Sequence, residues 1–268
     1  MVNKIDFILD LLEDPISSSN SGLAFLRAFI GALDANKTSE LLIYSISNDL
    51  QLRDLINRKI EFDLGDGKGF LYEDVAFKLL QIAKTSRYNI ALSSIISLST
   101  IFPSLKTDIQ LDILEFLTTS SRILFRRKAY KLMLDNYKGE YKNILTSVWM
   151  AHQEVECCHV MIQHFDAALL LNFRYTLLTV CKEGWLISKL YVKLGKEYPE
   201  LLHELRSYNT ETYCYCLWKL NLKLHSISSE ELLKQCRDQN FLIWCLGRLA
   251  EWELIMKIFS ITEFKPQN

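Results

Sequence analysis

Proline and glycine, the residues that most often interrupt regular secondary structure, are scarce in this chain. Its 268 residues include four prolines and nine glycines. Apolar residues recur at intervals of three and four positions instead of alternating, a pattern that favours helices over strands. Because 49% of the residues are hydrophobic, the chain can bury a substantial core. The sequence therefore predicts an all-α fold.

An excess of charge of one sign is lacking as well. The chain has 31 basic and 32 acidic residues and a pI near 6.5. Sequence-independent binding to nucleic acid relies on a positive field over much of the surface, and this balance argues against such a field. Any contact with nucleic acid would need a local basic patch.

The first residues lack the basic segment and long apolar run of a secretory signal, so we expect a cytoplasmic protein. The seven cysteines, an odd number without a CxxC pair, also fit a reducing compartment. The most hydrophobic stretch, residues 160–181, predicts a buried helix and no membrane contact, because charged and polar side chains interrupt it. These side chains are His164, Asp166, Asn172 and Arg174.

Four successive amphipathic helices are predicted in the middle of the chain, each with apolar residues three or four positions apart. Their apolar faces are Ala76, Leu79, Leu80 and Ala83; Ala91, Ile95 and Leu98; Ile109, Ile113, Phe116 and Leu117; and Phe125, Ala129, Leu132 and Met133. The separators, residues 85–89, 102–104 and 118–121, are short. Short connections join antiparallel neighbours, so we expect αα-hairpins.

The N-terminal part is predicted to form a helical segment, residues 1–61, with helices at 4–13, 23–33, 39–48 and 50–60. A glycine-rich loop, residues 62–69, separates it from a helical body, residues 70–268, and we expect the whole chain to form one continuous domain. The alternating glycines and Lys68 could cradle a phosphate, although the spacing is not that of a P-loop. We interpret the segment as an inter-helix loop, with a hairpin of short strands as the alternative.

Two internal repetitions support paired helices. Residues 200–209 and 231–240 share Glu, Leu, Leu, Arg and Asn at an offset of 31, and residues 186–190, 216–220 and 245–249 share an apolar pattern with a basic residue fourth. Units of this length are typical of helical arrays. The chain resembles the HEAT or armadillo-like superfamily in helix pairing over roughly residues 70–260. That resemblance implies antiparallel helix pairs stacked as a short, irregular α-solenoid.

The densest group of potential metal ligands is His152, Glu156 and His159, which would share one face of a continuous helix. Glu156 and His159 also form a Glu-x-x-His motif, and Glu200 and His203 form a second. Two such motifs are half of the di-iron carboxylate constellation, so a metal-dependent helical enzyme is one alternative. We favour an ordinary helix surface here and expect no metal and no cofactor.

The clearest basic patch consists of Arg122, Arg126, Arg127 and Lys131, four positions apart in two pairs. We expect it to contact a partner or an anion. The combination of this patch with five tryptophans resembles the HEAT-like DNA alkylation-repair glycosylases. That resemblance implies nucleic-acid binding as a second alternative. If these residues bind nothing, the same pattern indicates a solvated helix face with buried tryptophans.

No motif specifies a reaction, so the prediction for function is a non-catalytic protein-binding or scaffold module with an extended helical-repeat surface. The expected partner is a protein or peptide. Exposed Arg, Tyr and Trp are the side chains expected to anchor it.

Overall fold

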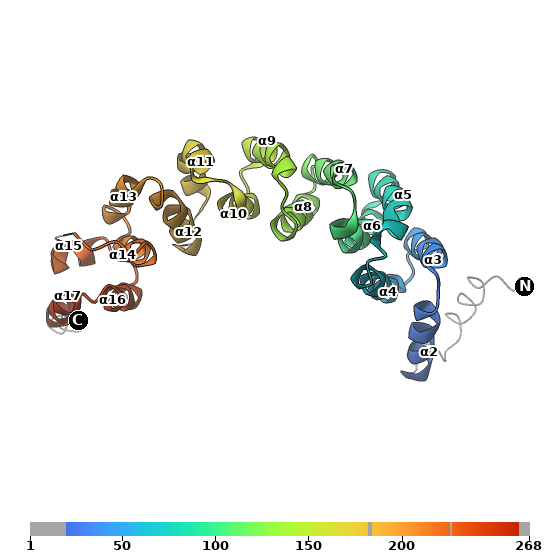
Figure 1. Ribbon diagram of the computed structural model, residues 1–268, viewed down its shortest axis with the longest axis horizontal. Coiled ribbons are helices and arrows are strands. Elements are labelled where there is room, and N and C mark those ends of the chain that lie inside the picture. The colour runs from blue at the N-terminus through green and yellow to red at the C-terminus, as the bar shows by residue number, and fades with distance from the viewer. Residues whose placement is uncertain (1–19, 182–183, 226, 263–268) are drawn as a thin grey trace, which may run out of the picture. The chain divides into compact units, whose positions relative to one another are not determined.

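The computed structural model describes residues 20–181, 184–225 and 227–262 (Figure 1). These residues form sixteen α-helices joined by short 3-10 helices and turns, and they contain no β-strand. The helices group into two compact units, Met1–Ile144 and Leu145–Asn268. The predicted all-α class is confirmed, and the alternative of a strand hairpin near Gly65 is wrong. The predicted helix at 4–13 lies outside the described residues.

The first unit is built from helices that pack mainly against their chain neighbours. Its α-helices are α2 (Asn20–Gly31), α3 (Ala35–Ser47), α4 (Arg53–Gly65), α5 (Glu73–Thr85), α6 (Tyr88–Ile101), α7 (Thr107–Thr118) and α8 (Ile123–Asp135). Three 3-10 helices join them: η2 (Gly69–Tyr72), η3 (Phe102–Ser104) and η4 (Gly139–Tyr141).

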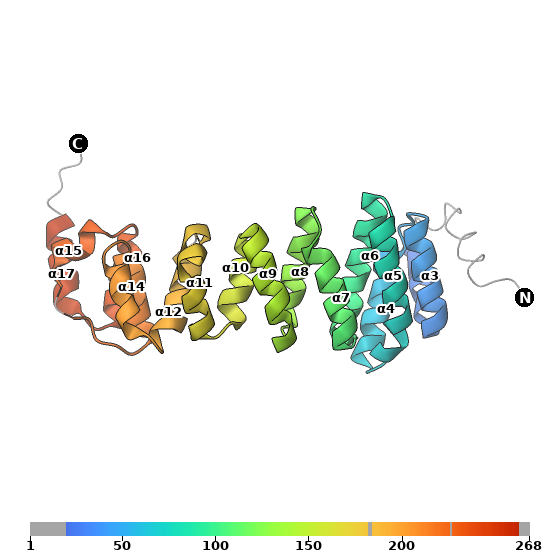
Figure 2. The ribbon, with the colours of Figure 1, turned by 90° about the horizontal axis from the view of Figure 1, so that it is seen from above.

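Alternate helices of the first unit form two layers. Helices α3, α5 and α7 contact one another in sequence, as do α4, α6 and α8, and each helix of one layer pairs with its chain neighbour in the other. Figure 2 shows the paired helices α5 and α6 running side by side. The predicted αα-hairpins are therefore present, with connectors close to the predicted ones.

The second unit repeats this plan. It comprises the end of α9 (Lys142–His152), followed by α10 (Val155–His164), α11 (Ala167–Val180), α12 (Gly184–Gly195), η5 (Pro199–Leu201), α13 (Leu202–Arg206), α14 (Thr210–Lys219), α15 (Ser229–Lys234), α16 (Gln239–Arg248) and α17 (Trp252–Thr262). Helices α10, α12, α14 and α16 pack in that order and form one layer. Helices α11, α13 and α15 lie on the other side, and α17 contacts both α15 and α16.

Polar caps define where several helices begin. Asp34, Asp166, Asn209, Ser228 and Asp238 each accept a hydrogen bond from the backbone amide three residues later, at 2.7 to 3.1 Å. Such caps satisfy amides that have no partner within the first helical turn. The predicted segment 160–181 is two helices and not one, because Asp166 caps a new helix after Phe165.

Left-handed residues end four helices. Asp49, Gln153, Asn221 and Ala250 have φ angles of 56°, 47°, 54° and 61° and follow α3, α9, α14 and α16. After Asp49, Asn221 and Ala250, the next amide donates back to a carbonyl of the last turn, as from Glu251 to Leu246 at 3.0 Å. Since none of the four is glycine, each break is hard to recognise in the sequence.

The cores follow the predicted apolar faces. The residues predicted to be apolar-facing in α5, α6 and α8 are all buried, and in α7 only Phe116 is half-exposed, with Leu114 buried beside its predicted neighbours. The predicted helices at 23–33, 39–48 and 50–60 correspond to α2, α3 and α4 with shifted ends. Helix α4 continues to Gly65, so the predicted loop at 62–69 is shortened to residues 66–68.

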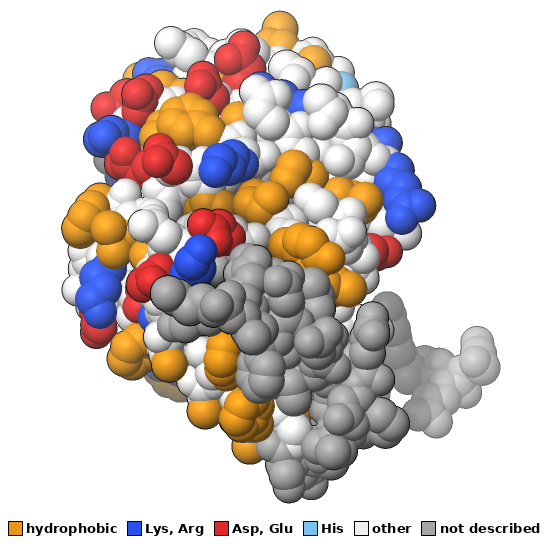
Figure 3. Space-filling view, turned by 90° about the vertical axis from the view of Figure 1, so that its right-hand side faces the viewer, with side chains coloured by type: hydrophobic (Ala, Val, Ile, Leu, Met, Phe, Trp, Pro, Cys, Tyr) orange, Lys and Arg blue, Asp and Glu red, His pale blue; other side chains and the backbone are white. Residues whose placement is uncertain are grey.

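Among the described residues, no helix is both long and apolar enough to cross a bilayer. On the face drawn in Figure 3, hydrophobic side chains are scattered among acidic and basic ones. Scattered apolar side chains are usual on protein surfaces and need no partner.

Candidate functional site

The three potential metal ligands around residue 156 do not share one helix face. His152 is the last residue of α9, whereas Glu156 and His159 belong to α10, and Gln153 in the left-handed conformation breaks the helix between them. The continuous helix on which their alignment depended is absent. His159 instead packs edge-on against the Trp185 ring, with centroids 4.9 Å apart.

The second Glu-x-x-His motif is also divided between elements. Glu200 lies in η5 and His203 in α13, where the His203 ring is 6.2 Å from that of His225. In the part of the chain that is described, no group of three or more His, Cys, Asp or Glu side chains is arranged to hold a metal ion. Within the described residues, neither Glu-x-x-His motif belongs to such a group.

The cysteines do not have the character of nucleophiles. All except the half-buried Cys236 are buried. Burial raises the pKa of Cys236 to about 11 and that of Cys245 to about 12, and raises the pKa of Cys157 further. A thiol reacts as its thiolate, so these side chains remain protonated and inert at neutral pH.

The glycine-rich segment does not form a phosphate cradle. The amides of Gly67 and Lys68 donate to the carbonyls of Leu64 and Asp63, both at 3.0 Å, so they are engaged within the turn. Gly67 has a φ of 76°, which favours glycine. Gly69 packs so closely on Ser104 that an added Cβ would lie 2.4 Å from the Ser104 Cβ. These glycines serve the turn and the packing.

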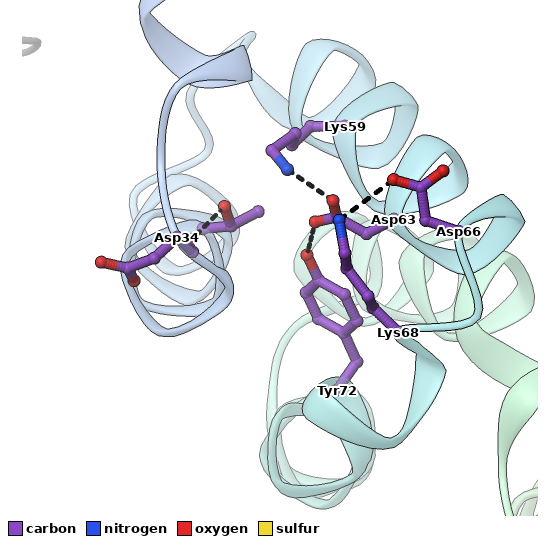
Figure 4. A network of polar contacts seen from close by, with 7 residues as sticks. Asp34, Lys59, Asp63, Asp66, Lys68 and Tyr72 are labelled. Atoms are coloured by element: carbon purple, nitrogen blue, oxygen red, sulfur yellow. Dashed lines mark hydrogen bonds and ion pairs between the residues drawn. The ribbon is translucent and has the colours of Figure 1, made fainter.

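A buried carboxylate network lies beside this turn (Figure 4). Asp63 pairs with Lys59 at 2.6 Å and accepts a hydrogen bond from the Tyr72 hydroxyl, while Lys68 pairs with the exposed Asp66 at 3.0 Å. Burial alone would raise the pKa of Asp63, but hydrogen bonds from Lys59 and Tyr72 hold it below its usual range. The ionised Asp63 thus joins α4 to η2.

The basic patch at α8 is smaller than predicted. Arg126 is buried and donates from Nη1 to the carbonyl of Ser120 at 2.7 Å. Arg127 and Lys131 are exposed, and Arg122 lies over the Tyr88 and Phe125 rings at 5.0 and 5.2 Å. Three of the four predicted residues therefore present charge at the surface.

A groove of about 890 Å³ lies on the layer of α10, α12, α14 and α16 in the second unit. Its apolar lining includes Trp185, Ile187, Val192, Tyr215 and Phe241. Its size is within the range of ligand sites. We call it the inner groove.

Basic side chains outnumber acidic ones in the inner groove. The cations are Lys189, Lys193, Lys196, Lys219 and Arg237, and the acids are Glu211 and Asp238. The Glu211 carboxylate accepts the backbone amide of Arg237 at 3.3 and 3.4 Å, and Asp238 caps α16 by accepting the amide of Phe241 at 3.0 Å. Both acids are thus held by backbone donors.

An aromatic residue precedes a basic one by four positions in each of three neighbouring helices. The pairs are Trp185 with Lys189 in α12, Tyr215 with Lys219 in α14, and Trp244 with Arg248 in α16, and the cation lies 4.9, 5.7 and 5.1 Å from the ring centroid. Each cation is exposed. We call these three pairs the aromatic–cation ladder.

The rings of α14 and α16 pack together beside the groove. Trp218 contacts Tyr215 and Trp244 at centroid distances of 5.7 and 5.1 Å, and Phe241 stacks on Trp244 at 5.8 Å. Lys219 lies 4.1 Å from the Trp218 centroid. The expectation of buried tryptophans holds for Trp149 and fails for Trp185, Trp244 and Trp252, which are 46%, 42% and 64% exposed.

A second hollow of about 600 Å³ lies among α11, α12 and α13 and is lined by tyrosines. Arg174 pairs with Glu204 at 3.2 Å, and Glu204 accepts a hydrogen bond from the Tyr191 hydroxyl at 3.1 Å. Burial raises the pKa of Tyr191 and of Tyr208. These phenols therefore stay protonated and act as structural donors, not as bases.

The internal repetition in the sequence includes the cations of the aromatic–cation ladder but not its aromatic residues. The repetition at 186–190, 216–220 and 245–249 aligns Lys189, Lys219 and Arg248, and all three are exposed. The aromatic partners lie just before the repeated segments, four positions ahead of each cation, and an extension of the comparison by a few residues would have found them. Comparisons of the chain with protein family models, with curated proteins and with solved structures found no match.

Proposed function

We propose that this chain is a non-catalytic protein-binding module and that the inner groove with its aromatic–cation ladder is its contact surface. The observation that carries the proposal is the ladder itself. Three adjacent helices present the same pair of an aromatic ring and a cation. The pairs of α12 and α14 line the inner groove, and the pair of α16 adjoins it through Trp244, which stacks on the groove residue Phe241. Arg, Tyr and Trp are the side chains that most often dominate binding energy at protein interfaces.

The helical plan supports this proposal. Within each unit, alternate helices pack in layers, as in HEAT and armadillo arrays, and such arrays commonly bind proteins along one layer. We accordingly propose that the antiparallel helix pairs of this chain stack as a short, irregular α-solenoid of the HEAT or armadillo type. A cytoplasmic location, expected from the cysteine pattern, is part of the same proposal.

The chemistry of the other clusters favours binding over catalysis. The thiols and phenols with raised pKa values remain protonated at neutral pH, and they include Cys236, Cys245 and Tyr191. A general base or a nucleophile needs a pKa near or below the operating pH.

Affinity capture from the source cells tests the proposal with three forms of the full chain. The ladder variant combines Lys189→Glu, Lys219→Glu and Arg248→Glu. The matched control combines Lys78→Glu, Lys84→Glu and Arg87→Glu, which also changes two lysines and one arginine at exposed positions, with Lys84 lying 5.8 Å from the Phe116 ring.

We expect a partner that is retained by the wild type and by the control and is lost from the ladder variant. Charge reversal places repulsion where the partner would bind, and such changes at interface centres cost several kcal/mol. If all three forms retain the same proteins, the inner groove is not the contact surface.

A further inference from the structure

We propose that the inner groove binds an extended acidic segment of a partner protein, with one carboxylate at each step of the ladder. This inference rests on the proposed function and adds the chemistry and spacing of the partner. It follows from the charge of helices α12, α14 and α16, from the distance between these helices and from the contacts that their aromatic rings already make.

Charge complementarity selects an acidic partner. Helices α12, α14 and α16 together contain four basic residues, Lys189, Lys193, Lys219 and Arg248, and one acidic residue, Glu211. Glu211 is buried and engaged by the amide of Arg237, and Lys193 donates to the carbonyls of Ile162 and Gln163 at 3.2 and 3.0 Å. The described structure gives the three ladder cations contacts with rings and no ion pair.

The separation of the steps selects an extended chain. Packed helices lie about 8 to 10 Å apart, which sets the lateral distance between successive steps of the ladder. An extended peptide advances about 3.3 Å per residue, which places side chains three positions apart at about 10 Å. A segment crossing α12, α14 and α16 can therefore present an acidic residue at every third position to Lys189, Lys219 and Arg248 in turn.

The rings argue for a peptide over a single-stranded nucleic acid. Base stacking needs an accessible aromatic face. Trp244 already stacks on Phe241 with an interplanar angle of 15° and lies 5.1 Å from Arg248, and Trp185 is contacted by His159 and Lys189. These contacts occupy the ring faces and orient the cations. A ligand can therefore contact mainly the positive charges and the apolar edges of the rings.

A role confined to helix stability does not explain the whole ladder. Lys219 and Arg248 lie in the last turns of α14 and α16, where a cation favourably offsets the helix dipole. Lys189 lies in the middle of α12 and gains no such benefit. The shared feature of the three positions is the ring four residues earlier and the common surface.

The test uses fluorescence anisotropy with three labelled probes and the full chain. The first probe is a short peptide with glutamate at every third position and alanine or serine elsewhere. The second has the same composition with its glutamates placed together, and the third is an oligothymidylate of equal charge. The proteins are the wild type, the variant Lys189→Gln/Lys219→Gln/Arg248→Gln, and the control Lys78→Gln/Lys84→Gln/Arg87→Gln.

We expect the spaced peptide to bind the wild type and the control about tenfold more tightly than the clustered peptide. The triple ladder variant should lose that difference, and Lys189→Gln alone should weaken binding of the spaced peptide about threefold without lowering the melting temperature of the fold. Glutamine is uncharged and only one atom shorter than lysine, and it keeps much of the packing of the lysine side chain, so a loss of affinity would report mainly the charge.

Equal binding of both peptides would overturn the spacing, and tighter binding of the oligothymidylate would overturn the peptide in favour of a nucleic acid. If neither peptide binds while cellular capture still depends on the ladder, the acidic segment is wrong and the binding module stands. If capture is also independent of the ladder, both proposals fail.

Discussion

At the scale of single residues, Asp63 links two elements of the first unit through its side chain. It is buried, and it joins Lys59 on its own helix to Tyr72 in η2. Removal of its charge would leave the Lys59 ammonium, whose side chain is only 12% exposed, without its partner.

We predict that Asp63→Asn lowers the free energy of unfolding by about 2 to 4 kcal/mol. Asp66→Asn is the matched control, because Asp66 pairs with Lys68 on the same turn but both side chains are more than 40% exposed. Its cost should stay below about 1 kcal/mol. Urea unfolding measures both, and equal losses would show that the Asp63 network is not special.

The lowered pKa of Asp63 also predicts a pH dependence. A carboxyl whose pKa is lower in the folded state stabilises the fold above its unfolded pKa, and this stabilisation is lost as the pH falls through the folded value. The difference in unfolding free energy between wild type and Asp63→Asn should therefore shrink between about pH 5 and the acid limit of folding. A difference that stays constant over that range would contradict the ionised network.

Residue-level prediction from the sequence succeeded for cores and failed where a backbone group decided the outcome. The apolar spacing identified Ala76, Leu79 and Ile95 as buried, because helix periodicity alone determines which face packs. Arg126 was expected at the surface beside Arg122, but the carbonyl of Ser120 draws it into the interior. The sequence does not indicate which backbone carbonyl lacks a hydrogen-bond donor from the backbone and will accept one from a side chain.

At the scale of elements, caps and breaks determine how the helices are arranged. His152 does not share a helix with Glu156 and His159, because Gln153 ends α9 in a left-handed conformation without being glycine. The two copies of the repetition, 200–209 and 231–240, bury leucines that their sequence alignment does not match. An offset of 31 aligns Leu201 with Leu232, whereas the structure buries Leu202 and Leu232, which are 30 apart. A one-residue shift of this kind follows from differing turns, which the identities do not reveal.

Asp238 offers a test of one cap that also borders the inner groove. We predict that Asp238→Ala lowers the free energy of unfolding by about 1 kcal/mol, because the amide of Phe241 loses its acceptor. Asp238→Ser should cost clearly less, since serine is also a favourable cap. Chemical denaturation compares the two, and a serine variant as unstable as the alanine variant would argue against a capping role.

At the scale of the whole molecule, the contacts fall into two groups, Met1–Ile144 and Leu145–Asn268. In helical arrays each element is stabilised chiefly by its neighbours, so a local defect should have local effects. We predict that Asp63→Asn accelerates hydrogen exchange in α3 to α6 and leaves α12, α14 and α16 unchanged. Mass spectrometry of peptic fragments resolves the two regions, and equal acceleration in both would show one cooperative unit.

The account depends most on the inner groove being where a partner binds, and site-specific photocrosslinking examines this directly. p-Benzoylphenylalanine would replace Phe241, which lines the groove, and in a matched control it would replace Phe77, an exposed phenylalanine of α5. The account predicts a covalent adduct with a partner protein from position 241 and none with that partner from position 77. An adduct that forms only from position 77, or equally from both, would contradict it.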